Sequence, residues 1–242
     1  MRLRLASYNI RKAVGLDWRR DPMRIARVLA EVSPDIALLQ EADKRLGGRP
    51  AALTAEAIEA SGMTVLPISM DGPSLGWHGN AVLVRPGIEL RDLRRVDLPA
   101  LEPRGALALS LDVDGAPLRV GALHLGLLRT WRRRQKSAVL QAMNELGDAP
   151  MVLGGDFNEW QLGQLADLAA AGLRPVTPGL SFHAARPMVA LDHFVVGPGL
   201  DVVRGGVEEG ALARRASDHL PIWIDLAPEG EGQAELTGAK PD

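Results

Sequence analysis

The chain contains no cysteine among its 242 residues, which excludes a disulfide framework and a thiolate metal site. Any bound metal must therefore be held by oxygen or imidazole ligands. No apolar run approaches the length of a membrane span, and the N-terminal residues alternate like a strand instead of forming the apolar core of a secretion signal. We therefore expect a cytoplasmic protein without a transmembrane segment and, because no assembly element is evident, a monomer.

The chain also has little net charge, because 28 basic and 30 acidic residues give a formal value of −2. Proteins that hold duplex DNA without regard to its sequence neutralise many phosphates with a broad basic face. The charge balance of this chain argues against that kind of binding.

Strand-like and helix-like patterns alternate along the whole chain, as in an α/β or mixed α+β domain. Helices are predicted at residues 21–32, 51–61, 129–146 and 161–171. Strands are predicted at residues 3–9, 36–40, 64–68, 81–85, 88–96, 106–113, 118–125, 151–156, 191–196, 202–207 and 222–226. The consecutive strands between residues 64 and 125 indicate hairpins, so we expect mixed and not purely parallel pairing.

No boundary rich in proline, glycine or serine divides the chain, so we expect one domain over residues 1–227. Residues 228–242 are small, polar and charged, which is the composition of a disordered tail.

The segment Gly154-Gly155-Asp156-Phe157-Asn158 follows the apolar run Met151-Val152-Leu153 and is the most informative in the chain. Two glycines at a strand end allow a turn or the close approach of another group. At strand spacing, Asp156 and Asn158 would point to the same side and deliver polar chemistry there. The same residues are equally typical of an Asx-stabilised turn between a strand and a helix.

Polar residues stand where several other apolar strands begin or end, which is where sheet proteins place functional sites. They are Asn9, Glu41, Asn80, His124, Asp156, Asn158, Asp192, Asp218 and His219. The set is rich in oxygen ligands, which suits Mg²⁺. His219 opens an apolar strand and, with an orienting carboxylate, could act as a general base. His193 follows Asp192 within a strand, so we expect it to face the other way and to be structural.

Seven short motifs stand in the order seen in the endonuclease/exonuclease/phosphatase family, which the chain resembles from Asn9 to His219. They are Ser7-Tyr8-Asn9-Ile10, Leu38-Leu39-Gln40-Glu41, Gly79-Asn80-Ala81, Leu123-His124-Leu125, Gly155-Asp156-Phe157-Asn158, Leu191-Asp192-His193-Phe194 and Ser217-Asp218-His219. Each motif alone is weak, but seven in order make a specific resemblance.

The resemblance implies a four-layer sandwich of two packed mixed β-sheets flanked by helices. It also implies a metal-dependent phosphoester hydrolase that uses Mg²⁺, with Mn²⁺ able to substitute. Glu41 matches the principal metal-binding glutamate of the family, and Asn9 and Asp218 match residues close to the metal or its waters.

The remaining motif residues match the groups that carry out the reaction in the family. Asp156 and Asn158 correspond to the pair that positions the nucleophile and contacts the phosphate. His219 corresponds to the catalytic histidine and Asp192 to the carboxylate that orients it. His124 resembles a second histidine that binds phosphate or assists proton transfer.

Three further residues are candidates for substrate binding. Arg104 opens a strand and could clamp a phosphate oxygen, although a surface arginine is an equal interpretation. Asn80 lies in one of the seven motifs. Arg11 stands where related nucleases often carry an acidic or smaller polar residue, which puts a second acidic metal ligand in doubt and offers a phosphate contact instead. His78 is either part of the pocket or a loop residue without a role.

The expected reaction is hydrolysis of a phosphodiester, and the expected substrate is a nucleic acid, a lipid headgroup or a small molecule. A phosphomonoesterase and an inactive phosphate-binding module are the alternatives. Four tryptophans, Trp18, Trp77, Trp131 and Trp160, neighbour the motifs. They either pack in ordinary loops or form a rim, in which at least one of Trp18, Trp77 and Trp131 contacts substrate.

Overall fold

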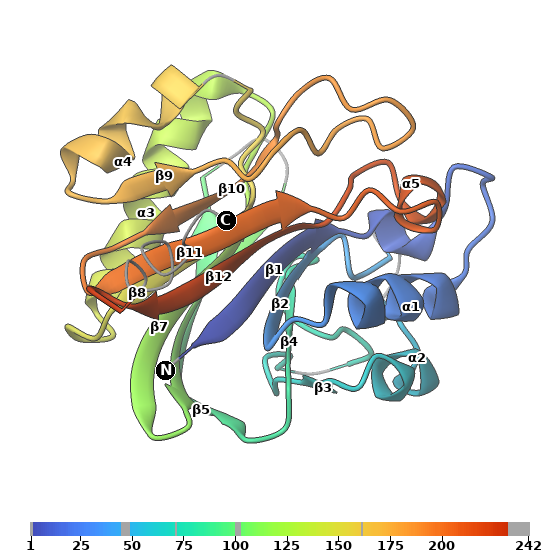
Figure 1. Cartoon of the computed structure of the whole chain (residues 1–242), viewed down its shortest axis with the longest axis horizontal. Coiled ribbons are helices and arrows are strands. Elements are labelled where there is room, and N and C mark those ends of the chain that lie inside the picture. Colours follow the sequence, from blue (N-terminus) through green and yellow to red (C-terminus); the bar gives the residue numbers. More distant parts are fainter. Residues whose placement is uncertain (1, 45–48, 71, 100–102, 161, 232–242) are drawn as a thin grey trace, which may run out of the picture.

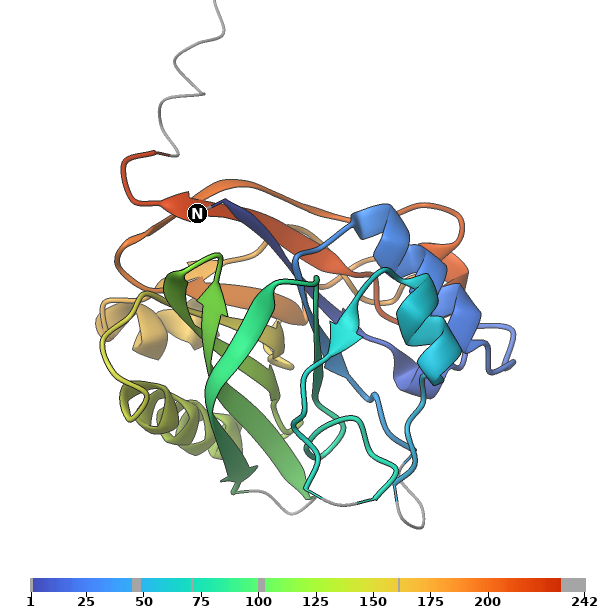
Figure 2. The ribbon, with the colours of Figure 1, turned by 90° about the horizontal axis from the view of Figure 1, so that it is seen from below.

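The structure is a computed structural model that describes residues 2–44, 49–70, 72–99, 103–160 and 162–231. Two six-stranded β-sheets pack face to face, and helices cover the outer face of each (Figures 1 and 2). This arrangement confirms the predicted four-layer sandwich. It also confirms the mixed pairing, because each sheet contains one parallel pair among antiparallel ones.

The first sheet has the strand order β11-β12-β1-β2-β4-β3. Its strands are β1 (Leu3–Asn9), β2 (Ile36–Gln40), β3 (Thr64–Val65), β4 (Ala81–Val84), β11 (Leu200–Val207) and β12 (Ile222–Pro228). Only β1 and β2 pair in parallel, and the connection between them is a helix, as parallel strands require.

The second sheet has the strand order β5-β6-β7-β8-β10-β9. Its strands are β5 (Ile88–Leu98), β6 (Arg104–Val113), β7 (Ala116–His124), β8 (Met151–Asp156), β9 (Arg174–Val176) and β10 (Asp192–Val196). The parallel pair here is β7 and β8, again joined by a helix.

Alternate residues of the central strands face the space between the sheets. Ile36 and Leu38 of β2 meet Val120 of β7, Val152 of β8 and Phe194 of β10 in one buried apolar cluster. The intervening residues of the same strands pack against the helices in two further clusters. This two-residue period decides which polar side chains can enter the site at the ends of the strands.

The helices cover the two outer faces, with α1 (Pro22–Val32) and α2 (Ala55–Ala60) on the first sheet and α3 (Arg129–Asn144) and α4 (Ala166–Ala170) on the second (Figure 2). α1 begins as predicted, because Asp21 accepts a hydrogen bond from the backbone N–H of Arg24 and Pro22 occupies the first turn. Among the residues described, no helix is long and apolar enough to cross a membrane.

Several predicted boundaries were wrong. The helix predicted from Ala51 begins at Ala55, because the Thr54 side chain caps it. The strand predicted over 64–68 is only the two residues of β3, and the helix predicted over 161–171 is a 3₁₀ turn (η2, Leu162–Leu165) followed by the short α4. Three short elements were not predicted from the sequence: β9, the 3₁₀ turn η1 (Arg11–Ala13) and α5 (Ala213–Ala216). Of the tail predicted as disordered, residues 232–242 lie outside the described residues.

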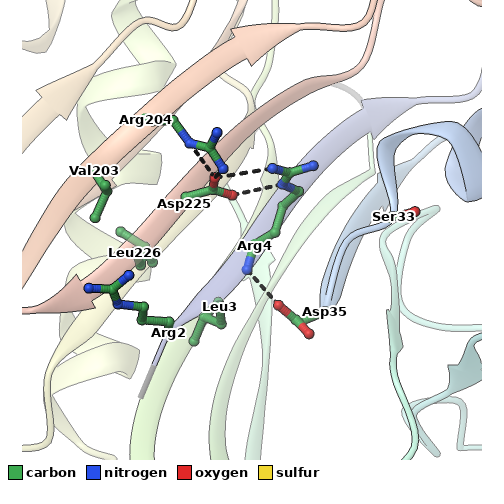
Figure 3. A pocket seen from close by; sticks show the side chains of 9 residues that line it. All are labelled: Arg2, Leu3, Arg4, Ser33, Asp35, Val203, Arg204, Asp225 and Leu226. Atoms are coloured by element: carbon green, nitrogen blue, oxygen red, sulfur yellow. Dashed lines mark hydrogen bonds and ion pairs between the residues drawn. The ribbon is translucent and has the colours of Figure 1, made fainter. Parts of the chain in front are cut away.

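An ionic cluster ties together β1, β11 and β12 on the outer face of the first sheet (Figure 3). Asp225 accepts hydrogen bonds from Arg4 Nε at 2.7 Å and from Arg204 Nη2 at 2.8 Å. The Arg4 guanidinium also lies 4.3 Å from the ring centre of Trp223. The cluster lines a cavity of about 300 Å³, but its cations are occupied by a carboxylate, so its role is structural.

Candidate active site

The candidate site lies at one end of the space between the sheets, where their apolar faces give way to polar side chains. Asn9 ends β1, His124 ends β7 and Asp156 ends β8. Asp192 opens β10 and is paired in register with Asp156. All four alternate in phase with the core between the sheets, so their buried side chains meet in one place.

Gly154 and Gly155 allow this meeting. A Cβ on Gly154 would lie 2.8 Å from a methyl group of Leu38 in the opposite sheet. A Cβ on Gly155 would lie 1.9 Å from the carbonyl oxygen of Leu123 on β7. Because these glycines have no side chain, β8 can lie close to Leu38 of the opposite sheet and to the backbone of β7 just before Asp156.

One carboxylate oxygen of Asp156 lies close to three other candidate residues. Its Oδ2 accepts a hydrogen bond from Asn9 Nδ2 at 3.1 Å. The same oxygen lies 3.4 Å from His124 Nε2 and 3.8 Å from His219 Nε2. The structure thus brings together Asn9, His124, Asp156 and His219 around one carboxylate oxygen.

Asn158 lies beyond the end of β8, in a left-handed conformation with φ of 51°. Its backbone N–H donates to Asp156 Oδ1 at 3.0 Å, which is the Asx turn that the sequence also allowed. Strand spacing therefore does not govern its direction, and its side-chain amide donates to the carbonyl of Leu125 at 2.9 Å.

His219 is held by Asp192. The His219 Nδ1 to Asp192 Oδ2 distance is 2.8 Å, and both side chains are buried. Ser181 Oγ donates to the same Asp192 oxygen at 2.5 Å, and the ring of Phe182 lies 5.0 Å from the imidazole. The imidazole is thus fixed in orientation, with Nε2 directed toward Asp156.

The charge of this pair is set by two opposing effects. Burial lowers the pKa of His219, but the nearby Asp192, followed by Asp156 and Asp218, outweighs burial and raises the pKa to about 10. The imidazole is therefore protonated at neutral pH in the protein without ligands.

His124 and Arg104 form a second contact on the other side of Asp156. Arg104 Nη1 lies 2.9 Å from His124 Nε2 and 3.1 Å from Nδ1. His124 contacts both Arg104 and Asp156, so only one imidazole separates the Arg104 guanidinium from the Asp156 carboxylate. Arg104 is half-buried.

Glu41 and Asp218 each contact a cation of η1. Lys12 Nζ forms an ion pair with Glu41 Oε2, and Arg11 Nε lies 3.4 Å from Asp218 Oδ2. Arg11 and Lys12 have positive φ angles of 45° and 57°, and Glu41 has a φ of 52°. Such backbone conformations cost about 1 kcal/mol or more each for residues other than glycine, and they cluster at functional sites.

Several candidate residues carry donor atoms of the kind that bind a hard divalent cation. Glu41, Asp218 and Asn9 supply carboxylate and amide oxygens, and oxygen is the ligand that Mg²⁺ prefers. Asp156, Asp192 and His219 also offer one ligand atom each within 4.8 Å of one another. In this second group, Asp192 Oδ2 receives hydrogen bonds from Ser181 and His219, whereas its buried Oδ1 has no hydrogen-bond partner among the described residues.

Asn80 and His78 flank Gly79, whose backbone lies beside that of Glu41. Asn80 is fully buried and donates to the carbonyl of Gly105 at 2.8 Å, while its Oδ1 has no partner among the described residues. His78 contacts Arg49 at 2.8 Å and lines a cavity of about 290 Å³. Burial and the charge of Arg49 lower the pKa of His78. His78 thus borders a separate pocket and does not join the cluster around Asp156.

The tryptophans divide into two kinds. Trp18 and Trp160 are 79% and 66% exposed, so ordinary loop packing does not describe them. Trp77 and Trp131 are half-buried. His193 is structural as predicted, because its ring nitrogens contact Thr177 Oγ1 and the carbonyl of Glu159.

A family model described as the Endonuclease/Exonuclease/phosphatase family matches residues 6–219. The chain belongs to this family. The protein YbhP of Escherichia coli K12 is 34% identical in an alignment of 167 residues. The alignment covers 62% of this chain and 63% of YbhP. The chain therefore matches less than two thirds of the length of this curated relative.

Solved structures of similar proteins agree with the endonuclease/exonuclease/phosphatase fold. One from Beutenbergia cavernae, described as a member of the family, is 25% identical with a TM-score of 0.70, covering 95% of this chain and 72% of the other. A mannosyl-6-phosphatase of Bacteroides thetaiotaomicron is 22% identical with a TM-score of 0.76, covering 93% and 99%. At 22% identity, the similarity to the mannosyl-6-phosphatase concerns the fold alone.

The endonuclease/exonuclease/phosphatase motifs do not contain every residue of the site. Lys12 lies three residues after Asn9, and only its position beside Arg11 could have drawn attention to it. Ser181 lies in a long loop without a pattern, so nothing in the sequence connects it with Asp192. Lys12 forms an ion pair with Glu41, and Ser181 donates a hydrogen bond to Asp192, so both contact charged residues that the motifs contain.

Proposed function

We propose that the protein hydrolyses phosphoesters with the help of a divalent metal ion, and that it prefers phosphodiesters. The observation that carries this proposal is the convergence of Asn9, His124 and His219 on one oxygen of Asp156, with Asp192 behind His219. A carboxylate and an imidazolium side by side can accept one proton and donate another, as hydrolysis requires.

We assign the proton transfers from the charges of the two groups. Asp156 takes a proton from the attacking water as the bond between the water oxygen and phosphorus forms. His219, protonated at neutral pH, gives its Nε2 proton to the leaving oxygen as the bond between phosphorus and that oxygen breaks. Asp192 holds the imidazole in one orientation and stabilises its positive charge, as in other Asp-His pairs.

The phosphate needs neutralisation, because its negative charge repels the attacking water. We assign to Arg104, His124 and the side-chain amide of Asn9 the donation of hydrogen bonds to its oxygens. Glu41, with Asn9 and Asp218, would hold Mg²⁺ or Mn²⁺. When bound, the metal supplies Lewis acidity toward a phosphate oxygen.

Hydrolysis of bis(p-nitrophenyl) phosphate with Mg²⁺ or Mn²⁺ tests the proposal, with EDTA as the metal-free reference. D156N and H219A should each lower turnover by about 10²-fold or more. E89Q is the matched control, because Glu89 is 66% exposed on β5 and should leave turnover unchanged. Equal turnover in the wild type with EDTA would contradict metal dependence.

The same assay with p-nitrophenyl phosphate separates the alternatives. A preference for this monoester would make the protein a phosphomonoesterase. Phosphate binding without turnover of either compound would make it a binding module. Nucleic acids, lipid headgroups and small phosphodiesters are the substrate classes to compare once turnover is established.

A further inference from the structure

The exposed apolar side chains are gathered at one end of the molecule. Seven large apolar residues are exposed among those described: Trp18, Met70, Leu127, Leu128, Trp160, Leu180 and Met188. Each lies in a loop that follows β1, β7 or β8, or that precedes β4 or β10. These are the loops around Asn9, His124, Asp156 and Asp192. The loop after β1 and the loop before β10 project at the right of Figure 1. In the described part of the chain, the turns at the opposite end carry none.

Three of these side chains belong to one local surface beside the site. Leu127 and Leu128, 66% and 52% exposed, directly precede α3, and Trp160 follows β8. Arg132 ties the two loops together, because it donates to the carbonyl of Leu127 at 2.5 Å and to Glu159 at 3.0 Å.

This surface is also cationic. Residues 125–134 contain four arginines and no acidic residue. Arg129 and Arg133 are exposed and line a cavity of about 450 Å³, which Lys136 and the acidic residues Glu159 and Asp167 also border. We call Leu127, Leu128, Arg129, Arg133 and Trp160 the α3 patch.

The α3 patch adjoins the candidate site. The backbone N–H of Leu125 donates to the carbonyl of Asp156 at 2.9 Å, and the Asn158 amide donates to the carbonyl of Leu125. Only two residues separate His124 from Leu127. Anything that covers the α3 patch therefore lies at the mouth of the site.

The chemistry of the patch favours one partner. Exposed leucines and a tryptophan insert among the headgroups and upper acyl chains of a bilayer, while neighbouring arginines are attracted to anionic lipids. Single-stranded nucleic acid instead stacks its bases on aromatic rings, and five of the seven exposed apolar residues are aliphatic. Aliphatic side chains offer bases no stacking surface.

We propose that the α3 patch docks the mouth of the active site on an anionic phospholipid bilayer, and that the substrate is a phosphoester of a lipid at that surface. This inference rests on the proposed phosphoester hydrolysis and names its substrate class. Docking would present the headgroup phosphate to Arg104 and Asp156 without removing the lipid from the membrane.

Vesicle flotation tests the docking. The wild type should bind vesicles that mix phosphatidylglycerol with phosphatidylcholine, and should bind less well as salt rises. The triple variant L127S/L128S/W160S should bind the vesicles at least about tenfold more weakly, because each apolar group that enters the interface strengthens binding. R129Q/R133Q should lose the preference for anionic vesicles. R91Q/R94Q is its matched control, because these two arginines are exposed on β5.

Turnover separates this inference from the proposed function. The triple variant should hydrolyse soluble bis(p-nitrophenyl) phosphate like the wild type but release less product from vesicle phospholipid. Equal vesicle binding by wild type and triple variant would overturn the docking, as would displacement of the wild type by single-stranded oligonucleotide. Binding without hydrolysis of any phospholipid would overturn the substrate class. Failure on the soluble diester would instead count against the proposed function.

Discussion

Replacement of Asp192 by asparagine should change the charge of His219. The variant keeps the size of the side chain but removes the carboxylate, which lies 2.8 Å from His219 Nδ1. Burial, which lowers the pKa of the imidazole, is then opposed only by the more distant Asp156 and Asp218. We expect the pKa of His219 to fall well below its wild-type value of about 10.

The size of the effect follows from the pKa. An imidazole has an ordinary value of 6.5, and one pH unit corresponds to about 1.36 kcal/mol, so a pKa of about 10 favours the protonated form by roughly 5 kcal/mol. Because the pKa is raised in the folded state, this contribution to stability is complete below pH 6.5. It is lost as the pH rises toward 10. The wild type should therefore lose stability across that range, and D192N should lose much less.

Two measurements check this prediction without a metal or a substrate. NMR titration of the histidine Cε1–H signals, with H219Q to assign the fifth resonance, reports the pKa directly. Urea unfolding at several pH values between 6.5 and 10 reports the change in the free energy of unfolding. With Mg²⁺ present, D192N should also slow diester hydrolysis by about 10²- to 10⁴-fold, because the proton donor is misoriented and uncharged.

The reasoning would be refuted by a wild-type His219 that titrates near 6.5. It would also fail if D192N left the histidine pKa unchanged, since Asp192 would then not be the group that holds the proton. S181A is a useful companion variant. It removes a hydrogen bond to the carboxylate but not its charge, so the imidazole should stay protonated at neutral pH.

Three further predictions concern packing, metal binding and the distant ionic cluster. G155A should destabilise the fold by about 3 kcal/mol in urea unfolding, because the new methyl group would lie 1.9 Å from the Leu123 carbonyl oxygen; an unchanged midpoint would contradict this. K12M should lower the Mg²⁺ concentration for half-maximal activity by about tenfold, because it removes the cation paired with Glu41; weaker metal binding would be the opposite result. D225N should cost about 1 kcal/mol at neutral pH. Burial raises the Asp225 pKa, but its two arginine partners outweigh burial and lower it, so this difference should shrink as acid protonates the wild-type carboxylate.

The alternation of strand-like and helix-like segments predicted only an α/β or mixed α+β domain, and the sandwich itself was predicted from the resemblance to the endonuclease/exonuclease/phosphatase family. Strand alternation also predicted that His193 faces away from Asp192, and the structure agrees, because Asp192 contacts His219 whereas His193 contacts Thr177 and Glu159. Helix ends were harder to predict, because Thr54 caps α2 through one side-chain contact that composition does not reveal. Short elements such as β9 exist only because a neighbouring strand pairs with them.

The contacts within the site could be predicted only in part, because many of them join residues far apart in the chain. Asn9 meets Asp156 across 147 positions, and a family motif pointed to both. Ser181 meets Asp192 through a loop whose path depends on the whole sandwich. Lys12 reaches Glu41 because η1 is left-handed, a conformation that nothing in Arg11-Lys12-Ala13 suggests.

Cations of the protein itself balance the carboxylates of the site. The four candidate carboxylates have four cationic partners or neighbours: Lys12 with Glu41, Arg11 with Asp218, protonated His219 with Asp192, and Arg104 linked to Asp156 through His124. A divalent cation added to this balanced set leaves a net positive charge, which the phosphate of a diester would then reduce. Metal and substrate should therefore strengthen each other's binding, because each neutralises the charge that the other introduces.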